Sequence, residues 1–98
     1  MINVPQEKPD ENVRRRRDRL AGLWAAELLG LMNEAAHDYV HALMRPGDQG
    51  GEEGLVHRLA RDLHGKATIQ DIRAKLAHFL GEAKKQLFHE RGGDGDRS

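Results

Sequence analysis

The sequence has no cysteine and a single serine, Ser98. Without cysteine the chain has no thiolate nucleophile, and it can form neither a disulfide nor a zinc–thiolate site. It also has no glycine-rich phosphate loop, no strand-to-helix serine motif and no dinucleotide-binding fingerprint. We therefore expect a protein that catalyses no reaction and holds no metal or other cofactor.

The sequence also has few aromatic residues, no net charge and no long apolar run. Aromatic residues make up 4% of the chain, which is few for lining a ligand pocket, and 16 basic residues balance 16 acidic ones. A neutral chain has no overall field that attracts nucleic acid or an anionic membrane. The longest apolar stretch, residues 20–32, is too short to cross a bilayer, and residues 1–10 lack the apolar core of a signal peptide. These absences predict a cytoplasmic protein without nucleic-acid binding or membrane insertion.

What remains is a sequence rich in helix-forming residues. Strand patterns are nearly absent, while Ala, Leu, Glu, Arg and Lys dominate. Glycine, proline and asparagine divide the chain into four segments, and we expect helices at residues 11–29, 34–45, 52–64 and 69–91. A mobile loop is expected at residues 46–54. The chain then divides into a flexible N-terminal tail, a bundle domain and a disordered C-terminal tail, at residues 1–10, 11–91 and 92–98.

Three local signals mark the expected helix ends. Gly30 suits the left-handed residue that follows a helix, so it should end the first segment. Asn33 is expected to cap the second segment. Thr68, followed three residues later by Asp71, forms a capping box before the fourth segment.

Apolar residues spaced three and four apart give each segment one face that must pack on another helix. The first segment is apolar or small in nearly every direction over residues 20–32, so it should lie centrally, beneath the other three. Gly22 and Ala26, one turn apart, allow a neighbouring helix to approach closely. Short connections favour antiparallel neighbours, so the prediction is an all-α, compact four-helix bundle. Its expected core residues are Trp24, Leu28, Leu59, Leu76, Phe79 and Leu80.

A run of arginines marks the beginning of the first segment. Because consecutive helix residues point about 100° apart, the run cannot form one strip. It is either a solvated entrance to the helix or a contact surface for an acidic protein partner. Nucleic-acid phosphates are a weaker alternative, since no aromatic residue interleaves with the arginines. We take all five as candidate partner-binding residues: Arg14, Arg15, Arg16, Arg17 and Arg19.

Glu27 is the only charged residue within residues 20–32, on a face that is otherwise apolar. A carboxylate there needs a cation or a route to water. Glu27 either pairs with a basic residue such as Arg73 or Lys75, lies exposed near the end of the bundle, or has a ligand-binding or catalytic role. The ion pair is our preferred interpretation. Trp24, the only tryptophan, is a core anchor or an interface contact. Glu27 and Trp24 are the candidate ligand-binding residues.

Two of the six histidines, His37 and His41, lie one helical turn apart, a spacing that allows two imidazoles to share a metal ion. No carboxylate or cysteine completes a recognisable ligand set with them. We therefore interpret this pair as a solvated helix flank and predict no metal site.

Two blocks of the sequence resemble a known family. The first, residues 14–31, is centred on Leu-Trp-Ala-Ala-Glu, and the second joins Ile-Arg-Ala-Lys-Leu-Ala at residues 72–77 to Glu-Ala-Lys-Lys-Gln-Leu at residues 82–87. Both are similar to the ATPase inhibitor zeta subunits of bacterial F-type ATP synthases. The likeness runs from about residue 13 to residue 90, with all four segments in order. The resemblance implies a four-helix bundle.

For function, the resemblance implies a non-catalytic subunit that binds the catalytic head of the ATP synthase and blocks ATP hydrolysis with an inserted N-terminal helical segment. The family carries a charged, helix-prone segment ahead of the arginine block, whereas this chain has Pro5 and Pro9 there. Because proline disfavours a helix, we expect binding with weak inhibition. Two alternatives remain open: a bundle that binds a nucleotide or another small ligand, and a helical adaptor or homodimer with another protein partner.

Overall fold

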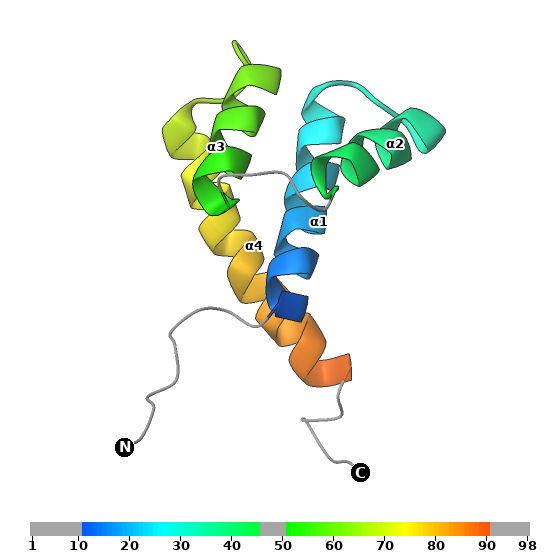
Figure 1. Cartoon of the computed structure of the whole chain (residues 1–98), viewed down its shortest axis with the longest axis vertical. Helices are drawn as coiled ribbons and strands as arrows, with labels where there is room; N and C mark the ends of the chain where they lie inside the picture. Colours follow the sequence, from blue (N-terminus) through cyan, green and yellow to red (C-terminus); the bar gives the residue numbers. More distant parts are fainter. Residues whose placement is uncertain (1–10, 46–50, 91–98) are drawn as a thin grey trace.

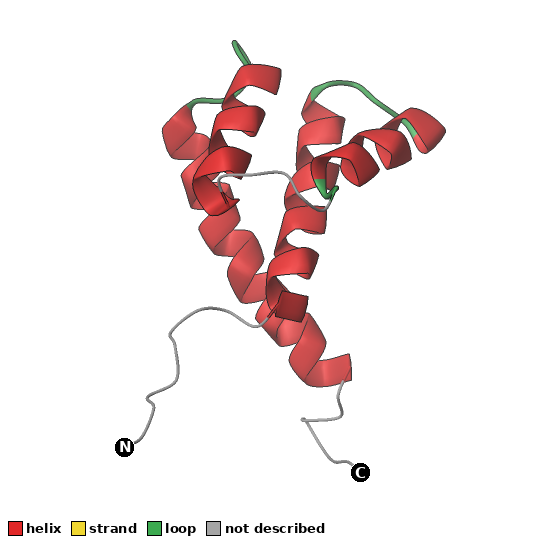
Figure 2. Cartoon of the chain, viewed as in Figure 1, coloured by secondary structure: helices red, strands yellow, loops and turns green. Residues whose placement is uncertain are grey.

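The computed structural model describes residues 11–45 and 51–90, and every regular element in these ranges is a helix. The helices are α1 (Glu11–Leu28), α2 (Asn33–Leu43), α3 (Gly51–Asp62) and α4 (Ile69–Glu90), as Figures 1 and 2 show. Each helix end lies within two residues of its predicted position. The all-α, four-helix prediction is confirmed. The predicted tails, residues 1–10 and 92–98, and residues 46–50 of the predicted loop lie outside the described residues. The loop prediction is wrong for residues 51–54, which form the first turn of α3.

The end of α1 follows the glycine signal in the sequence. Gly30 adopts a left-handed backbone with φ +77°. Its N–H donates to the Glu27 carbonyl at 3.0 Å, and the Leu31 N–H donates to the Ala26 carbonyl at 2.9 Å. This pair of bonds is the Schellman arrangement, which satisfies carbonyls that the end of a helix leaves without partners. The prediction for Gly30 is confirmed.

The start of α4 follows its sequence signal too, but the start of α2 does not. The Thr68 N–H donates to Asp71 Oδ2 at 2.9 Å, and the Asp71 N–H donates to Thr68 Oγ1 at 3.0 Å, so the capping box is confirmed. The prediction that Asn33 caps α2 is wrong, because Met32 holds the cap position without a side-chain bond. Asn33 is the first helical residue and has φ +52°. Asparagine tolerates this conformation better than most residues, so it aids the turn through its backbone.

The four helices form two pairs joined along one seam. α1 and α4 make the most extensive contact, α2 packs mainly on α1, and α3 packs mainly on α4 (Figure 1). α1 and α4 are antiparallel, because Arg16 near the start of α1 bonds to Glu90 at the end of α4. The prediction that α1 lies beneath all three other helices holds for α4 and α2, whereas α3 rests chiefly on α4.

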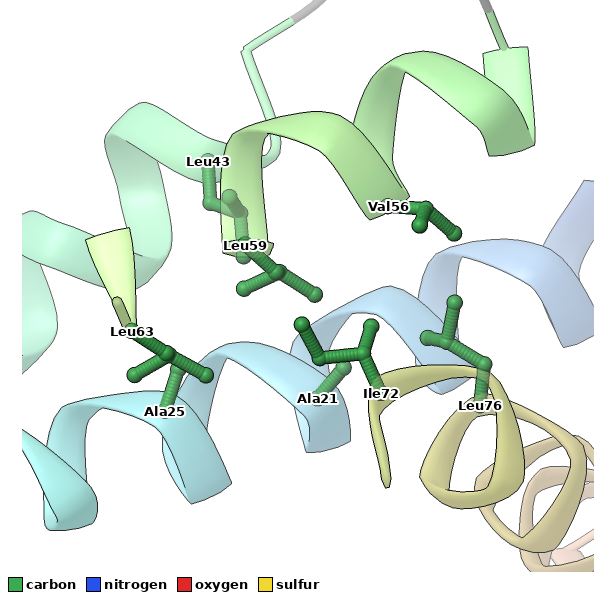
Figure 3. Close-up of a cluster of buried hydrophobic side chains, with 8 residues drawn as sticks. All are labelled: Ala21, Ala25, Leu43, Val56, Leu59, Leu63, Ile72 and Leu76. Atoms are coloured by element: carbon green, nitrogen blue, oxygen red, sulfur yellow. The ribbon is translucent and has the colours of Figure 1, made fainter. Parts of the chain in front are cut away.

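One cluster of buried side chains fills the centre of the bundle (Figure 3). Of the predicted core residues, Leu59 and Leu76 belong to this cluster, and Trp24 and Phe79 are partly buried against it. The prediction is wrong for Leu28, which is 37% exposed, while Leu80 is only partly buried. The reason is that α1 turns alanines, not leucines, toward the centre. The members of the cluster are Ala21, Ala25, Leu43, Val56, Leu59, Leu63, Ile72 and Leu76.

The small residues of α1 let α2 approach closely, as predicted. A β-carbon placed on Gly22 would lie 3.2 Å from Leu43 Cδ2 and 3.2 Å from Val40 Cγ2, closer than most such contacts. Ala26, one turn further on, is buried as well. A hydrogen bond from the Tyr39 hydroxyl to Asp62 Oδ2 at 2.8 Å links α2 to α3. These contacts place α2 across the face of α1 that carries Gly22.

Among the helices in the described ranges, none combines the length and the hydropathy that a membrane span requires.

Candidate partner-binding surface

The arginine run of α1 spreads around the helix, and one member faces inward. Arg17 is only 4% exposed, in line with Ala21 on the side of α1 that faces the core. Its Nε donates to Asp18 Oδ1 and its Nη1 donates to Glu52 Oε1, each at 2.9 Å. Burial raises the pKa of Asp18 in spite of the neighbouring guanidinium. Arg17 therefore ties α1 to the start of α3.

Two further arginines also have carboxylate partners within the fold. Arg16 bonds to both carboxylate oxygens of Glu90, with Nη2 at 2.9 Å from Oε1. This hydrogen bond lowers the pKa of Glu90 and fastens the last turn of α4 to α1. Arg14 pairs with Glu11 on its own helix at 2.6 Å. Arg14, Arg16 and Arg17 thus all have carboxylate partners inside the chain.

The remaining two arginines, Arg15 and Arg19, point away from the bundle. Both are exposed, and neither forms an ion pair with a residue in the described ranges. Leu23, one turn further along the same side of α1, is 44% exposed, and Glu27 follows after another turn. We call these four residues the outward row of α1. It offers two cations, an apolar side chain and one carboxylate to a partner.

The expected ion pair of Glu27 does not form. Arg73 instead donates to both carboxylate oxygens of Glu53, at 2.8 and 3.0 Å, and Lys75 lies over the Trp24 ring. In the part of the chain that the structure describes, Glu27 has no ion-pair partner and is exposed. The preferred interpretation is therefore wrong. Because Glu27 lies in the outward row, water solvates its carboxylate and no buried cation is needed.

Trp24 lies between the core and the surface. One side packs against the core cluster, and its ring meets the edge of Phe79 with centroids 6.4 Å apart. The other side lines a surface groove of about 490 Å³ between α1 and α4, which we call the α1–α4 groove. The core-anchor interpretation describes the packed side of Trp24, and the interface contact stays a prediction. The groove is lined by Trp24, Leu28, Lys66, Ala67, Asp71, Ala74, Lys75 and His78.

The α1–α4 groove combines an apolar floor with cations. Lys75 Nζ lies 5.8 Å from the ring centroids of both Trp24 and Phe79. Lys66 and Lys75 are exposed, and among the described residues no carboxylate pairs with either of them. The one carboxylate in the lining, Asp71, accepts the Thr68 N–H, and this bond lowers its pKa. The Asp71 carboxylate is thus already hydrogen-bonded at the start of α4.

Sequence reasoning missed the groove, because it assigned residues to faces one helix at a time. Lys66 precedes α4 by three residues, and Lys75 appeared only as a partner for Glu27. The sequence of α1 contained one usable signal. Leu28 continues the apolar side of the helix beyond Ala21 and Ala25, the alanines that face the core. Asking whether α4 has an apolar residue opposite Leu28 would have indicated that Leu28 borders a site at the surface.

His37 and His41 are both exposed on α2, with ring centroids 4.9 Å apart. In the described ranges no group of three histidine, cysteine, aspartate or glutamate side chains is arranged to hold a metal ion. The pair therefore lies on a solvated flank of α2.

Comparison with known proteins agrees with this description. No curated protein and no solved structure gave a significant match. The family model for ATPase inhibitor subunit zeta matches residues 7–86, which include the arginine run, the outward row and the α1–α4 groove. An inhibitor subunit acts by binding, which points to a non-catalytic role. The resemblance seen in the two sequence blocks is confirmed, and the chain belongs to the ATPase inhibitor subunit zeta family.

Proposed function

We propose that this chain is a non-catalytic regulatory subunit that binds the catalytic head of an F-type ATP synthase and modulates ATP hydrolysis. In this proposal it works in the cytoplasm, held near the inner membrane through the ATP synthase. Family membership supports the ATP synthase as the partner. The observation that carries the proposal is the outward row of α1, where Arg15 and Arg19 are exposed and lack carboxylate partners among the described residues.

The geometry of Arg15 and Arg19 favours recognition of carboxylates. Each guanidinium presents a planar set of donors that can bind a carboxylate through two parallel bonds. Being one turn apart, the two side chains can act on one acidic patch, and exposed Leu23 adds apolar area beside them. Arg14, Arg16 and Arg17 would have to leave internal carboxylates before they could contribute. We therefore assign direct contact to Arg15 and Arg19, and an orienting role to the other three.

The proposal includes binding that inhibits hydrolysis only weakly. An inserted element must resist the motion of the subunits around it, which a continuous helix does best. Pro5 and Pro9 stand ahead of α1, and each removes a backbone donor and crowds the preceding turn of any helix. Ordering such a stretch also costs about 1–2 kcal/mol of backbone entropy per residue. Association through α1 does not depend on that stretch.

The binding half is tested by titrating the chain against the purified catalytic head. Arg15→Ala/Arg19→Ala should weaken the affinity by about tenfold or more, which corresponds to about 1.4 kcal/mol. The matched control is Arg45→Ala/Lys84→Ala, which removes two exposed cations elsewhere. The control should bind like the unmodified chain. An equal loss of affinity in both variants would show that the effect comes from overall charge. If the unmodified chain does not bind the catalytic head, the proposal is overturned.

The inhibition half is tested by the rate of ATP hydrolysis at concentrations that saturate binding. The unmodified chain should slow hydrolysis only slightly, whereas Pro5→Ala/Pro9→Ala should slow it several-fold more at the same occupancy. Strong inhibition by the unmodified chain would contradict the weak-inhibition claim and leave the binding claim intact.

A further inference from the structure

The α1–α4 groove has the composition of a docking site for an acidic segment. Its floor is apolar, formed by Trp24, Ala67 and Ala74, with Leu28 left 37% exposed at its border. Covering the exposed parts of the Leu28 and Trp24 side chains with a partner removes apolar surface from water, which favours binding. The site lies on a different part of α1 from Arg15 and Arg19, one to three turns further toward the carboxyl end.

The charges around this floor are unbalanced although the chain as a whole is neutral. Lys66 lies in the connection before α4, and Lys75 lies in the second turn of α4. Most other described cations have carboxylate partners: Arg58, for example, pairs with Asp62 within α3, and Arg73 pairs with Glu53 and so joins α4 to α3. The groove cations have no such role. Asp71 offsets little of their charge toward a partner, since its carboxylate is bonded to Thr68.

The position of Lys75 is also defined by the floor. Its ammonium lies 5.8 Å from two aromatic centroids, so the rings hold the cation above the apolar surface without neutralising it. An anion that reaches Lys75 therefore also places its neighbouring atoms on Trp24. This geometry favours the binding of a segment that combines a carboxylate with an adjacent apolar side chain.

The spread of the cations favours a polypeptide segment. Lys75 lies six residues beyond Ile69, about 9 Å of helix rise into α4, and Lys66 lies in the connection before that helix. An occupant must therefore offer anionic groups at two well-separated points, with apolar atoms between them. Two carboxylates that flank an apolar side chain on a helix or an extended strand meet this requirement.

We propose that the α1–α4 groove binds an acidic segment of an ATP synthase subunit, in which carboxylates flank an apolar side chain, and this proposal rests on the proposed function. The apolar side chain covers Trp24 and Leu28, while the carboxylates pair with Lys66 at one end and with Lys75 at the other. The groove and the outward row then form two separate contacts with the partner, and α1 contributes residues to both. Two contacts fix the orientation of the chain on its partner, which one contact does not.

The test is the affinity of purified catalytic head for Lys66→Glu/Lys75→Glu, with Arg45→Glu/Lys84→Glu as the matched control of equal charge change. The groove variant should bind at least about tenfold more weakly, and the control should stay within about twofold of the unmodified chain. Circular dichroism and thermal unfolding establish that both variants are folded. If the unmodified chain binds and the two variants lose affinity equally, or the groove variant loses none, the groove proposal is overturned. If the unmodified chain does not bind at all, the proposed function fails first.

A second measurement needs no substitution. A carbodiimide joins a lysine amine to a carboxylate only where the two are in contact, so it can be applied to the complex of the unmodified chain with the catalytic head. Mass spectrometry should find Lys66 or Lys75 joined to aspartate or glutamate of a single ATP synthase subunit. Joining through Lys84 and Lys85 alone, in a complex that does form, would overturn the groove proposal.

Discussion

At the scale of single residues, Arg17 shows how position on a helix decides what an arginine does. It lies one turn before Ala21, on the side of α1 that faces the core, and only 4% of it is exposed. A charge in that position destabilises a fold unless it is paired, and Asp18 and Glu52 both pair with it. Arg15, two residues earlier, is rotated by about 160° and faces the solvent. Two arginines of one run therefore have different roles: Arg17 stabilises the fold, and Arg15 is available at the surface.

The same contrast between inside and outside gives a matched test with two leucines. Leu76 is 2% exposed within the core cluster, and Leu28 is 37% exposed beside the groove. Leu76→Ala should lower the free energy of unfolding by about 2–5 kcal/mol, because it leaves a cavity. Leu28→Ala should lower it by less than about 1 kcal/mol. Urea unfolding of both variants measures the difference, and equal losses would contradict the assignment of Leu28 to the surface.

At the scale of helices, the contact between α1 and α2 depends on the absence of a side chain. Gly22 allows Val40 and Leu43 to lie against the α1 backbone. A glycine within a helix is normally unfavourable, since it loses more backbone entropy than alanine on folding. Here the close approach of α2 offsets part of that cost. Gly81, in α4, has no comparable neighbour, since nothing lies within 4 Å of where its β-carbon would be.

The two glycines therefore predict different outcomes for one substitution. Gly81→Ala should raise the free energy of unfolding by about 0.5–1 kcal/mol, as expected for an open helix position. Gly22→Ala should gain clearly less or lose stability, because its β-carbon would lie 3.2 Å from two side chains of α2. Thermal unfolding of the two single variants under identical conditions decides this. An equal gain at both positions would argue against close packing at Gly22.

Helices and their ends were readable from the sequence where the signal is local. The Gly30 turn and the Thr68–Asp71 capping box involve residues within five positions of each other, so spacing alone predicts them. The same reasoning failed for Asn33, because asparagine is favourable both as a cap and in a left-handed backbone conformation. Only the path of the connection between α1 and α2 selects between these two roles. Leu28 and the groove depend on which part of α4 lies beside α1. That depends on tertiary packing, which helical periodicity does not contain.

At the scale of the whole molecule, arginine–carboxylate pairs join helices around the apolar core. Arg16 and Glu90 connect α1 to α4, and Arg73 and Glu53 connect α4 to α3. The hydrogen bonds from the two arginines lower the pKa values of Glu53 and Glu90 below the ordinary value of 4.5. A carboxyl group whose pKa is lower in the folded state stabilises that state when it is ionised.

This coupling predicts how stability changes with acid. The contribution of Glu53 and Glu90 is fully present above pH 4.5 and is lost as the pH falls through their lower folded-state values. Glu53→Gln/Glu90→Gln should therefore lose less stability on acidification than the unmodified chain. Asp18, whose pKa burial raises, acts in the opposite sense in both proteins and cancels in the comparison. Melting temperatures measured from about pH 6 down to about pH 3 test this, and parallel curves would contradict it.

The arrangement of the helices as two pairs on one seam has a consequence for local unfolding. α2 contributes only Val40 and Leu43 as buried residues and rests mainly on α1, so it can detach at a smaller cost than separating α1 from α4. Such an opening breaks the Tyr39–Asp62 bond and exposes Gly22 to water. No residue of α2 lines the α1–α4 groove. A molecule with its second helix undocked would therefore keep its docking site, and a partner could be engaged by a subpopulation that is not fully folded.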